Sequence, residues 1–129
     1  MRRMVLVLLG VGVMLAAGGQ VFAHHSFSAT YDGSKEVQVE GVVKEFVWRN
    51  PHSFLRLDVT GKDGATVTWT LEWGSISQLT HAQLTRTTLR PGDRLVVTGA
   101  PPRDESSPRL RIGTIRRPAD NWSWSGAVD

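Results

Sequence analysis

The segment FLRLDVTGKDGATVTWTLEW, residues 54–73, carries the clearest β pattern in this chain. Apolar and polar side chains alternate from Phe54 to Thr60 and again from Thr66 to Trp73. A two-residue period is typical of strands with one buried face. The intervening Gly61-Lys62-Asp63-Gly64 has the composition of a tight hairpin turn. The segment therefore predicts two antiparallel strands, the second with an inward face made of Val67, Trp69, Leu71 and Trp73.

The residues on either side of this hairpin extend the pattern. Upstream, Lys35–Trp48 is long and rich in valine, and the glycine at its middle, Gly41, predicts a bulge or sharp bend. Downstream, Ser75 is a suitable N-cap for a helix of two or three turns. Two more strands are expected at Arg94–Gly99 and Leu110–Ile115.

Three strands, a helix and two further strands are the order of elements in an OB-fold. We therefore expect an all-β protein with one short helix, built as an OB-fold-like five-stranded Greek-key barrel with the helix between strands three and four. The bent first strand fits, because it must pair in both sheets; a small open sandwich is the alternative. Residues 24–117 would form the barrel domain and residues 118–129 a C-terminal tail of loose composition that carries Trp122 and Trp124.

Residues 1–23 have the features of an export signal. Arg2-Arg3 forms a basic start, Val5–Ala17 is apolar, and Val21-Phe22-Ala23 resembles a cleavage site. The apolar run is shorter than the roughly 20 residues of a typical membrane anchor, although an uncleaved anchor remains the alternative. Cleavage between Ala23 and His24 would release a periplasmic or secreted protein without a membrane span, and 106 of the 129 residues would remain.

The composition of that mature chain limits its chemistry. Removal of Arg2 and Arg3 lowers the formal net charge from +3 to +1, so the basic character of the whole chain says little about its partners. The chain has no cysteine, and all three methionines lie in the signal. A metal site would then use histidine, carboxylate, backbone and terminal groups, which favours Cu(II) or another divalent ion over Cu(I).

Cleavage would make His24 the first residue, followed directly by His25. The α-amine and imidazole of His24 could then chelate a divalent metal such as Cu(II), with His25 as a further ligand. His52, in the turn after Asn50-Pro51, is the candidate for another nitrogen ligand. The alternatives are a solvated chain start and an ordinary turn histidine. His81, in the predicted helix, is a weaker candidate.

A second hypothesis is a recognition module for an unidentified protein, glycan or small-molecule partner in the periplasm. Its groove would lie beside the turn after the first strand and the end of the third, at Trp48, Arg49, Asn50, Glu72 and Trp73. In this hypothesis Glu72 is an acceptor in the groove, whereas in the first it is a possible hard ligand. A solvated strand residue is the plainer reading of Glu72.

Other functional classes are disfavoured. Residues 86–117 hold eight arginines against three acids, but export and inward-facing tryptophans argue against nucleic acid as the partner. The chain has neither a nucleophile elbow nor a glycine-rich phosphate loop. A copper-dependent redox enzyme is a third possibility, without the substrate surface that such chemistry needs. We therefore expect a binding or accessory protein that is not an enzyme.

Several short motifs point to one family. They are His24-His25-Ser26-Phe27 with Tyr31-Asp32, Gly41-Val42-Val43, Trp48-Arg49-Asn50-Pro51-His52 and Leu89-Arg90-Pro91-Gly92-Asp93. Together they resemble a family of small exported bacterial proteins classed as a domain of unknown function, over essentially the whole mature chain. Members often carry Gly-Trp in place of Gln83-Leu84 and Arg in place of His81. The resemblance implies the fold and compartment, and it leaves the function to the residues.

Overall fold

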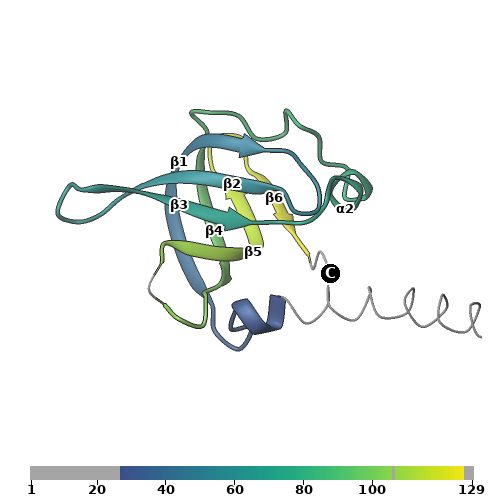
Figure 1. Ribbon diagram of the computed structural model, residues 1–129. Helices are drawn as coiled ribbons and strands as arrows, with labels where there is room; N and C mark the ends of the chain where they lie inside the picture. The colour runs from purple at the N-terminus through teal and green to yellow at the C-terminus, as the bar shows by residue number, and fades with distance from the viewer. Residues whose placement is uncertain (1–26, 106, 127–129) are drawn as a thin grey trace, which may run out of the picture. The chain divides into compact units, whose positions relative to one another are not determined.

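The computed structural model describes residues 27–105 and 107–126. Residues 27–30 form one helical turn, and the barrel unit begins at Tyr31. Six strands and a short helix make up this unit (Figure 1). In chain order they are β1 (Val37–Val47), β2 (Phe54–Thr60), β3 (Thr66–Glu72), α2 (Ile76–His81), β4 (Arg94–Ala100), β5 (Arg109–Arg117) and β6 (Trp122–Ser125).

The strands form one sheet in the order β3-β2-β1-β4-β5-β6, and strands adjacent in this order all pair antiparallel. A parallel pairing between Thr70–Glu72 of β3 and Arg109–Arg111 of β5 closes the first five strands into a barrel. The predicted OB-fold-like barrel, with its helix between strands three and four, is therefore confirmed.

Strand β1 belongs to both halves of the barrel. Its residues 37–42 pair with β4, and its residues 42–47 pair with β2. Gly41 lies near this changeover, where an added Cβ would strike the carbonyl of Asp58. The glycine thus permits close approach of two strands, whereas the bulge itself falls between Val43 and Glu45.

The core follows the predicted alternation at the barrel end of β3. Leu71 and Trp73 are fully buried, and Trp69 packs against the core with part of its surface exposed. Val67 is 48% exposed, because the β2–β3 hairpin extends beyond the rest of the barrel (Figure 1). The inward face of this strand therefore enters the core only in its second half.

Helix α2 begins as the sequence predicts. Ser75 Oγ accepts a hydrogen bond from the Gln78 backbone N–H at 3.2 Å, and Gln78 Oε1 accepts one from the Ser75 N–H at 2.8 Å. This reciprocal capping box satisfies two of the N–H groups that a helix start leaves unpaired. Leu79 is fully buried and anchors the helix to the core.

The segment expected to be a loose tail contains a sixth strand. Residues Trp122–Ser125 pair with Thr114–Arg117 of β5. Both tryptophans pack against the core, and the Trp124 ring meets the Trp73 ring edge-on at a centroid distance of 4.9 Å. Burial of two indoles on alternate residues explains why so short a strand is held.

Candidate functional site

The most unusual polar group in the described part of the barrel is Glu72, at the end of β3. Its residue surface is only 8% exposed, although its strand position faces away from the core. The carboxylate contacts side chains from two different segments. Oε2 accepts a hydrogen bond from the Tyr31 hydroxyl at 2.5 Å, and Oε1 lies 2.7 Å from His52 Nδ1. We call Tyr31, His52, Glu72 and Arg109 the Glu72 cluster.

Arg109 contributes positive charge to this cluster. The β3–β5 pairing places it opposite Thr70, and its Nη2 lies 3.9 Å from Glu72 Oε2. Its side chain is 42% exposed, so this ion pair is the most solvated contact of the carboxylate. The closer contacts with Tyr31 and His52, at the better shielded positions, therefore define the geometry of Glu72.

Tyr31 is a hydrogen-bond donor in this arrangement. It is 3% exposed, and burial together with the neighbouring Glu72 carboxylate raises the pKa of its phenol well above the usual value. Both effects disfavour the phenolate, because it would place a second negative charge in a poorly hydrated site. The hydroxyl consequently keeps its proton and directs it at Glu72.

The position of His52 is fixed by its neighbour, Ser53. This serine is fully buried; its N–H donates to the Gly74 carbonyl at 2.8 Å, and its carbonyl accepts from the Trp73 N–H at 2.9 Å. Its hydroxyl also bonds to the Arg49 backbone. The turn is thus fastened to the residues after β3, which brings His52 beside Glu72.

The other residues of the predicted groove have different environments. Trp73 is 1% exposed, and its indole nitrogen has no hydrogen-bond partner among the described residues. Trp48 is partly buried and meets the Phe46 ring edge-on. Asn50 Oδ1 accepts from the Ile76 N–H at 2.9 Å and so helps to cap α2.

Arg49 lies apart from these contacts. Its guanidinium carbon stands 4.9 Å from the centroid of the Phe54 ring, and the residue is exposed. Of the five predicted groove residues, Arg49 and Asn50 are exposed and Trp48 is partly exposed, whereas Glu72 and Trp73 are enclosed.

The predicted metal ligands are divided between described and undescribed parts of the chain. His24 and His25 lie outside the described residues. Within residues 27–105 and 107–126, no group of three or more histidine, aspartate or glutamate side chains could hold a metal ion. His81 is exposed on α2, where its Nδ1 contacts the Ser77 carbonyl at 2.8 Å. His52 and Glu72 are thus the pair of candidate ligands that the fold brings together.

Sequence reasoning missed Tyr31 and Arg109 as members of this site. Tyr31 belongs to the motif that follows the His-His pair, but no periodicity connects it with a strand 41 residues away. Arg109 reaches Glu72 through the parallel β3–β5 pairing, which joins segments distant in the chain. Tyr31 is the only tyrosine of the sequence, which was the one available signal.

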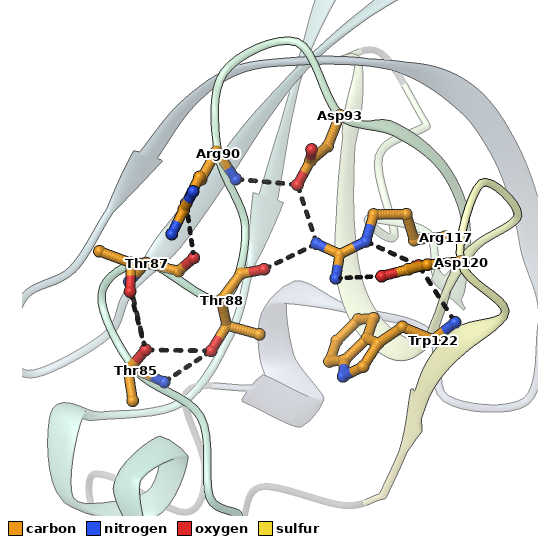
Figure 2. Close-up of polar contacts among 8 residues, drawn as sticks. All are labelled: Thr85, Thr87, Thr88, Arg90, Asp93, Arg117, Asp120 and Trp122. Carbon is orange, nitrogen blue, oxygen red and sulfur yellow. Dashed lines mark hydrogen bonds and ion pairs between the residues drawn. The ribbon is translucent and has the colours of Figure 1, made fainter.

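A second polar cluster lies at the end of β5 (Figure 2). The Arg117 guanidinium donates to the Thr88 carbonyl at 2.8 Å and to Asp93 Oδ2 at 3.0 Å. It also binds both carboxylate oxygens of Asp120, at 3.0 and 2.9 Å, and stacks over the Trp122 ring at 5.3 Å. We call Thr88, Asp93, Arg117, Asp120 and Trp122 the Arg117 cluster.

The Arg117 cluster borders an open concavity of about 590 Å³, whose remaining lining includes Thr85, Thr87 and Arg90. Figure 2 shows that these residues form hydrogen bonds and ion pairs with one another. Arg90, for example, donates from its backbone N–H to Asp93 Oδ2 and from its Nε to the Thr87 carbonyl. These contacts join the 85–93 loop to β5 and to the start of β6, as expected of a cluster that stabilises the fold.

Comparison with known proteins agrees with the motifs. A family model described as a family of unknown function, DUF6152, matches residues 12–111. The chain belongs to this family. The match includes His52, Glu72 and Arg109, together with the whole of β1 to β4. No curated protein shows significant similarity to the chain.

Within residues 27–105 and 107–126, no helix has the length and apolar character needed to span a bilayer. The predicted export signal, residues 1–23, lies outside the described residues.

Proposed function

We propose that this protein is exported and acts as a small binding or accessory protein for a divalent metal ion, with Cu(II) as the preferred ion. The α-amine and imidazole of His24 would chelate the metal, and His52 would add a further nitrogen, with His25 as another ligand. These nitrogen donors suit the tetragonal geometry of Cu(II). The proposal assigns no catalytic step to the protein.

The observation that carries the proposal is the close contact between His52 Nδ1 and Glu72 Oε1, which lie 2.7 Å apart. Metal-binding histidines commonly donate one ring N–H to a carboxylate, which fixes the tautomer and makes the other nitrogen a better ligand. In His52 that other nitrogen is Nε2. The carboxylate–histidine pair is therefore the support that a metal ligand at this position would need.

Chain length is compatible with participation of the N-terminal pair. His24 stands seven residues before Tyr31, whose hydroxyl is bonded to the same Glu72 carboxylate. Seven residues can span at most about 25 Å. The chain length thus keeps the α-amine of a chain starting at His24 within about 25 Å of Tyr31.

A recognition module remains the second proposal. It would use Trp48 and Arg49, which present surface beside the turn that holds Asn50. The burial of Trp73 and the internal bonding of Glu72 leave this groove fewer side chains with which to bind a partner. For this reason we place metal binding first.

The proposed function is tested by Cu(II) titration of protein that starts at His24, followed by calorimetry and EPR spectroscopy. The matched control carries one extra alanine before His24, which removes the α-amine from its chelating position but leaves every side chain in place. We expect the extension to weaken binding by orders of magnitude and to change the EPR spectrum. Equal affinities and spectra would refute the proposal.

The titration should also depend on pH. The α-amine and imidazole have ordinary pKa values near ~7.7–8.0 and ~6.5, and each must lose its proton to bind the metal. Copper affinity is therefore expected to fall as the pH decreases through that range. A pH-independent affinity would contradict coordination by these two nitrogens.

A further inference from the structure

The β2–β3 hairpin leaves one strand edge open. Strand β3 pairs with β2 along its whole length, from Thr66 to Glu72, but its pairing with β5 covers only Thr70–Glu72. The hairpin extends beyond the rest of the barrel (Figure 1). Residues 66–69 of β3 therefore have no strand on their second side within the described chain.

The hydrogen bonds around this edge show which backbone groups face it. Thr70 donates its N–H to the Pro108 carbonyl at 2.9 Å, so its backbone groups point away from β2. In an antiparallel strand, successive residues direct these groups to alternate sides. The N–H and C=O groups of Thr66 and Thr68 consequently face the open side, where no described residue bonds to them.

The edge lacks the devices by which proteins usually protect an exposed strand, which are charged side chains, proline and bulges. Residues 66–69 read Thr-Val-Thr-Trp, and the β2–β3 register runs without a shift from the pair Thr60↔Thr66 to the pair Phe54↔Glu72. A regular, uncharged edge of this kind is a template for pairing with another strand.

Val67 gives this edge an apolar face. It is 48% exposed and lies opposite Val59 in the register, and Trp69, two residues further on, is partly exposed. These three side chains share one face, because side chains alternate along a strand and opposed residues point to the same side. The other face is polar, and there the Thr68 hydroxyl donates to Asp58 Oδ1 at 2.6 Å.

A second copy of the same edge complements these groups. With Val67 opposite Val67 of the second copy in an antiparallel pair, each Thr66 lies opposite a Thr68. Both threonine pairs are then of the hydrogen-bonded type, and their four N–H···O=C bonds use the open backbone groups and leave the bond of Thr70 intact. The two valines form the non-hydrogen-bonded pair, in which side chains approach most closely.

We propose that the protein forms a two-fold symmetric dimer by antiparallel pairing of the β3 edges, centred on Val67. The dimer goes beyond the proposed metal binding and does not depend on it. Its interface is short, below the roughly 1,200 Å² of a standard stable complex, so association is weak and depends on concentration. Each copy uses its open edge once, and the assembly therefore closes at two chains.

The first experiment compares two substitutions of Thr68. Thr68→Pro removes the N–H that faces the open edge and takes no part in the β2–β3 ladder, a position at which strands accept proline. Thr68→Val is the matched control, because it keeps this N–H and, like the proline variant, removes the hydroxyl bonded to Asp58. The variants start at His24 and are measured with a metal chelator present. Circular dichroism and thermal unfolding establish that each is folded.

Sedimentation velocity from about 10 µM to about 1 mM covers the range of a weak dimer. The wild type and Thr68→Val should move from monomer towards dimer as the concentration rises. Thr68→Pro should weaken dimerisation by about 10- to 100-fold, because symmetry makes one substitution remove two of the four hydrogen bonds. A wild type that stays monomeric throughout, or a proline variant that dimerises as well as the valine variant, would overturn the proposal.

A disulfide tests the register itself. The sequence has no cysteine, so Val67→Cys introduces a single thiol. The Cα atoms of a non-hydrogen-bonded pair lie about 4.5 Å apart, a separation that a disulfide can span. Under mild oxidation Val67→Cys should form linked dimers at least about 10-fold faster than Lys62→Cys, whose thiol is exposed at the hairpin turn, because pairing raises the effective concentration of the thiols.

Equal rates for the two cysteine variants would show that the β3 edges do not meet at Val67, and the dimer would be refuted. The open edge would then be left to an extended segment of a different protein. Copper titration of the wild type is a separate measurement, so failure of the dimer and failure of the proposed function are distinguishable.

Discussion

The Glu72 cluster and the Arg117 cluster are both built around a charged side chain with several partners, yet they differ in how that charge is compensated. Arg117 faces two carboxylates and a carbonyl, which satisfy four of its N–H bonds. Glu72 is the single acid among a tyrosine, a histidine and an arginine. The first arrangement is complete within itself, whereas the second includes a titratable ring with metal-binding chemistry.

Exposure separates the two clusters further. The Glu72 side chain is 11% exposed, and that of its partner His52 28%. In the Arg117 cluster the cation is 18% exposed, but Asp120 is 54% exposed and can be hydrated if its partner is lost. Loss of a polar contact should therefore lower the free energy of unfolding more at Glu72, because the partners that remain are less accessible to water.

The first prediction concerns the shielded carboxylate. Glu72→Ala should lower the free energy of unfolding by about 3 kcal/mol, because it strands the buried Tyr31 hydroxyl and the Nδ1–H of His52. Urea denaturation measures this loss. The control Glu45→Ala removes an exposed partner of Arg56 and should cost less than about 0.5 kcal/mol. If both variants lost the same free energy of unfolding, the low exposure of Glu72 would contribute nothing to stability.

The second prediction concerns the balanced cluster. Arg117→Ala should cost about 1–2 kcal/mol, since its carboxylate partners can be rehydrated. Because these charges are partly exposed, the loss should shrink in high salt. Arg94→Ala, which removes the 62%-exposed partner of Glu40, is the control and should have little effect. A loss larger than that of Glu72→Ala would reverse the order proposed for the two clusters.

The third prediction concerns Tyr31 alone and the stability of the protein at high pH. The pKa of its phenol is raised above the ordinary 10.0 by burial and by Glu72. The native state thus holds this proton more firmly than the unfolded state does. Its contribution to stability is complete below pH 10 and is lost as the pH rises through the native-state pKa.

Because the chain has one tyrosine, the ultraviolet absorbance of tyrosinate reports this group without overlap from another. The titration should begin well above pH 10 in the native protein and near pH 10 in concentrated urea. A native midpoint at the ordinary value would contradict the buried Tyr31–Glu72 hydrogen bond.

Much of the barrel was predictable because its signals are local. The alternation in residues 66–73 and the glycine-rich turn before them specify a hairpin, and the bounds of β2 agree with the prediction. Ser75 and Gln78 specify the helix start through a capping box only four residues long. Strand β6 was missed because four residues with two indoles have no clear pattern until β5 provides a partner.

The candidate site was predictable only in part. A turn histidine and a strand glutamate could be singled out by residue type, and His52 and Glu72 were both named. Their contact could not be foreseen, because Ser53 brings the turn to the residues after β3 through backbone bonds. The burial of Glu72 was also unexpected, since its strand position faces outward and Tyr31 approaches from a distant segment.

Local spacing and composition thus account for the strands, the helix start, the family motifs and the nitrogen-rich character of any metal site. The fold adds the contacts among Tyr31, His52, Glu72 and Arg109, which lie up to 78 residues apart in the chain. Hydrophobic periodicity states which face of a strand is buried against its own sheet. It carries no information about which remote side chain will complete the hydrogen bonds on the other face, because that depends on how the barrel closes.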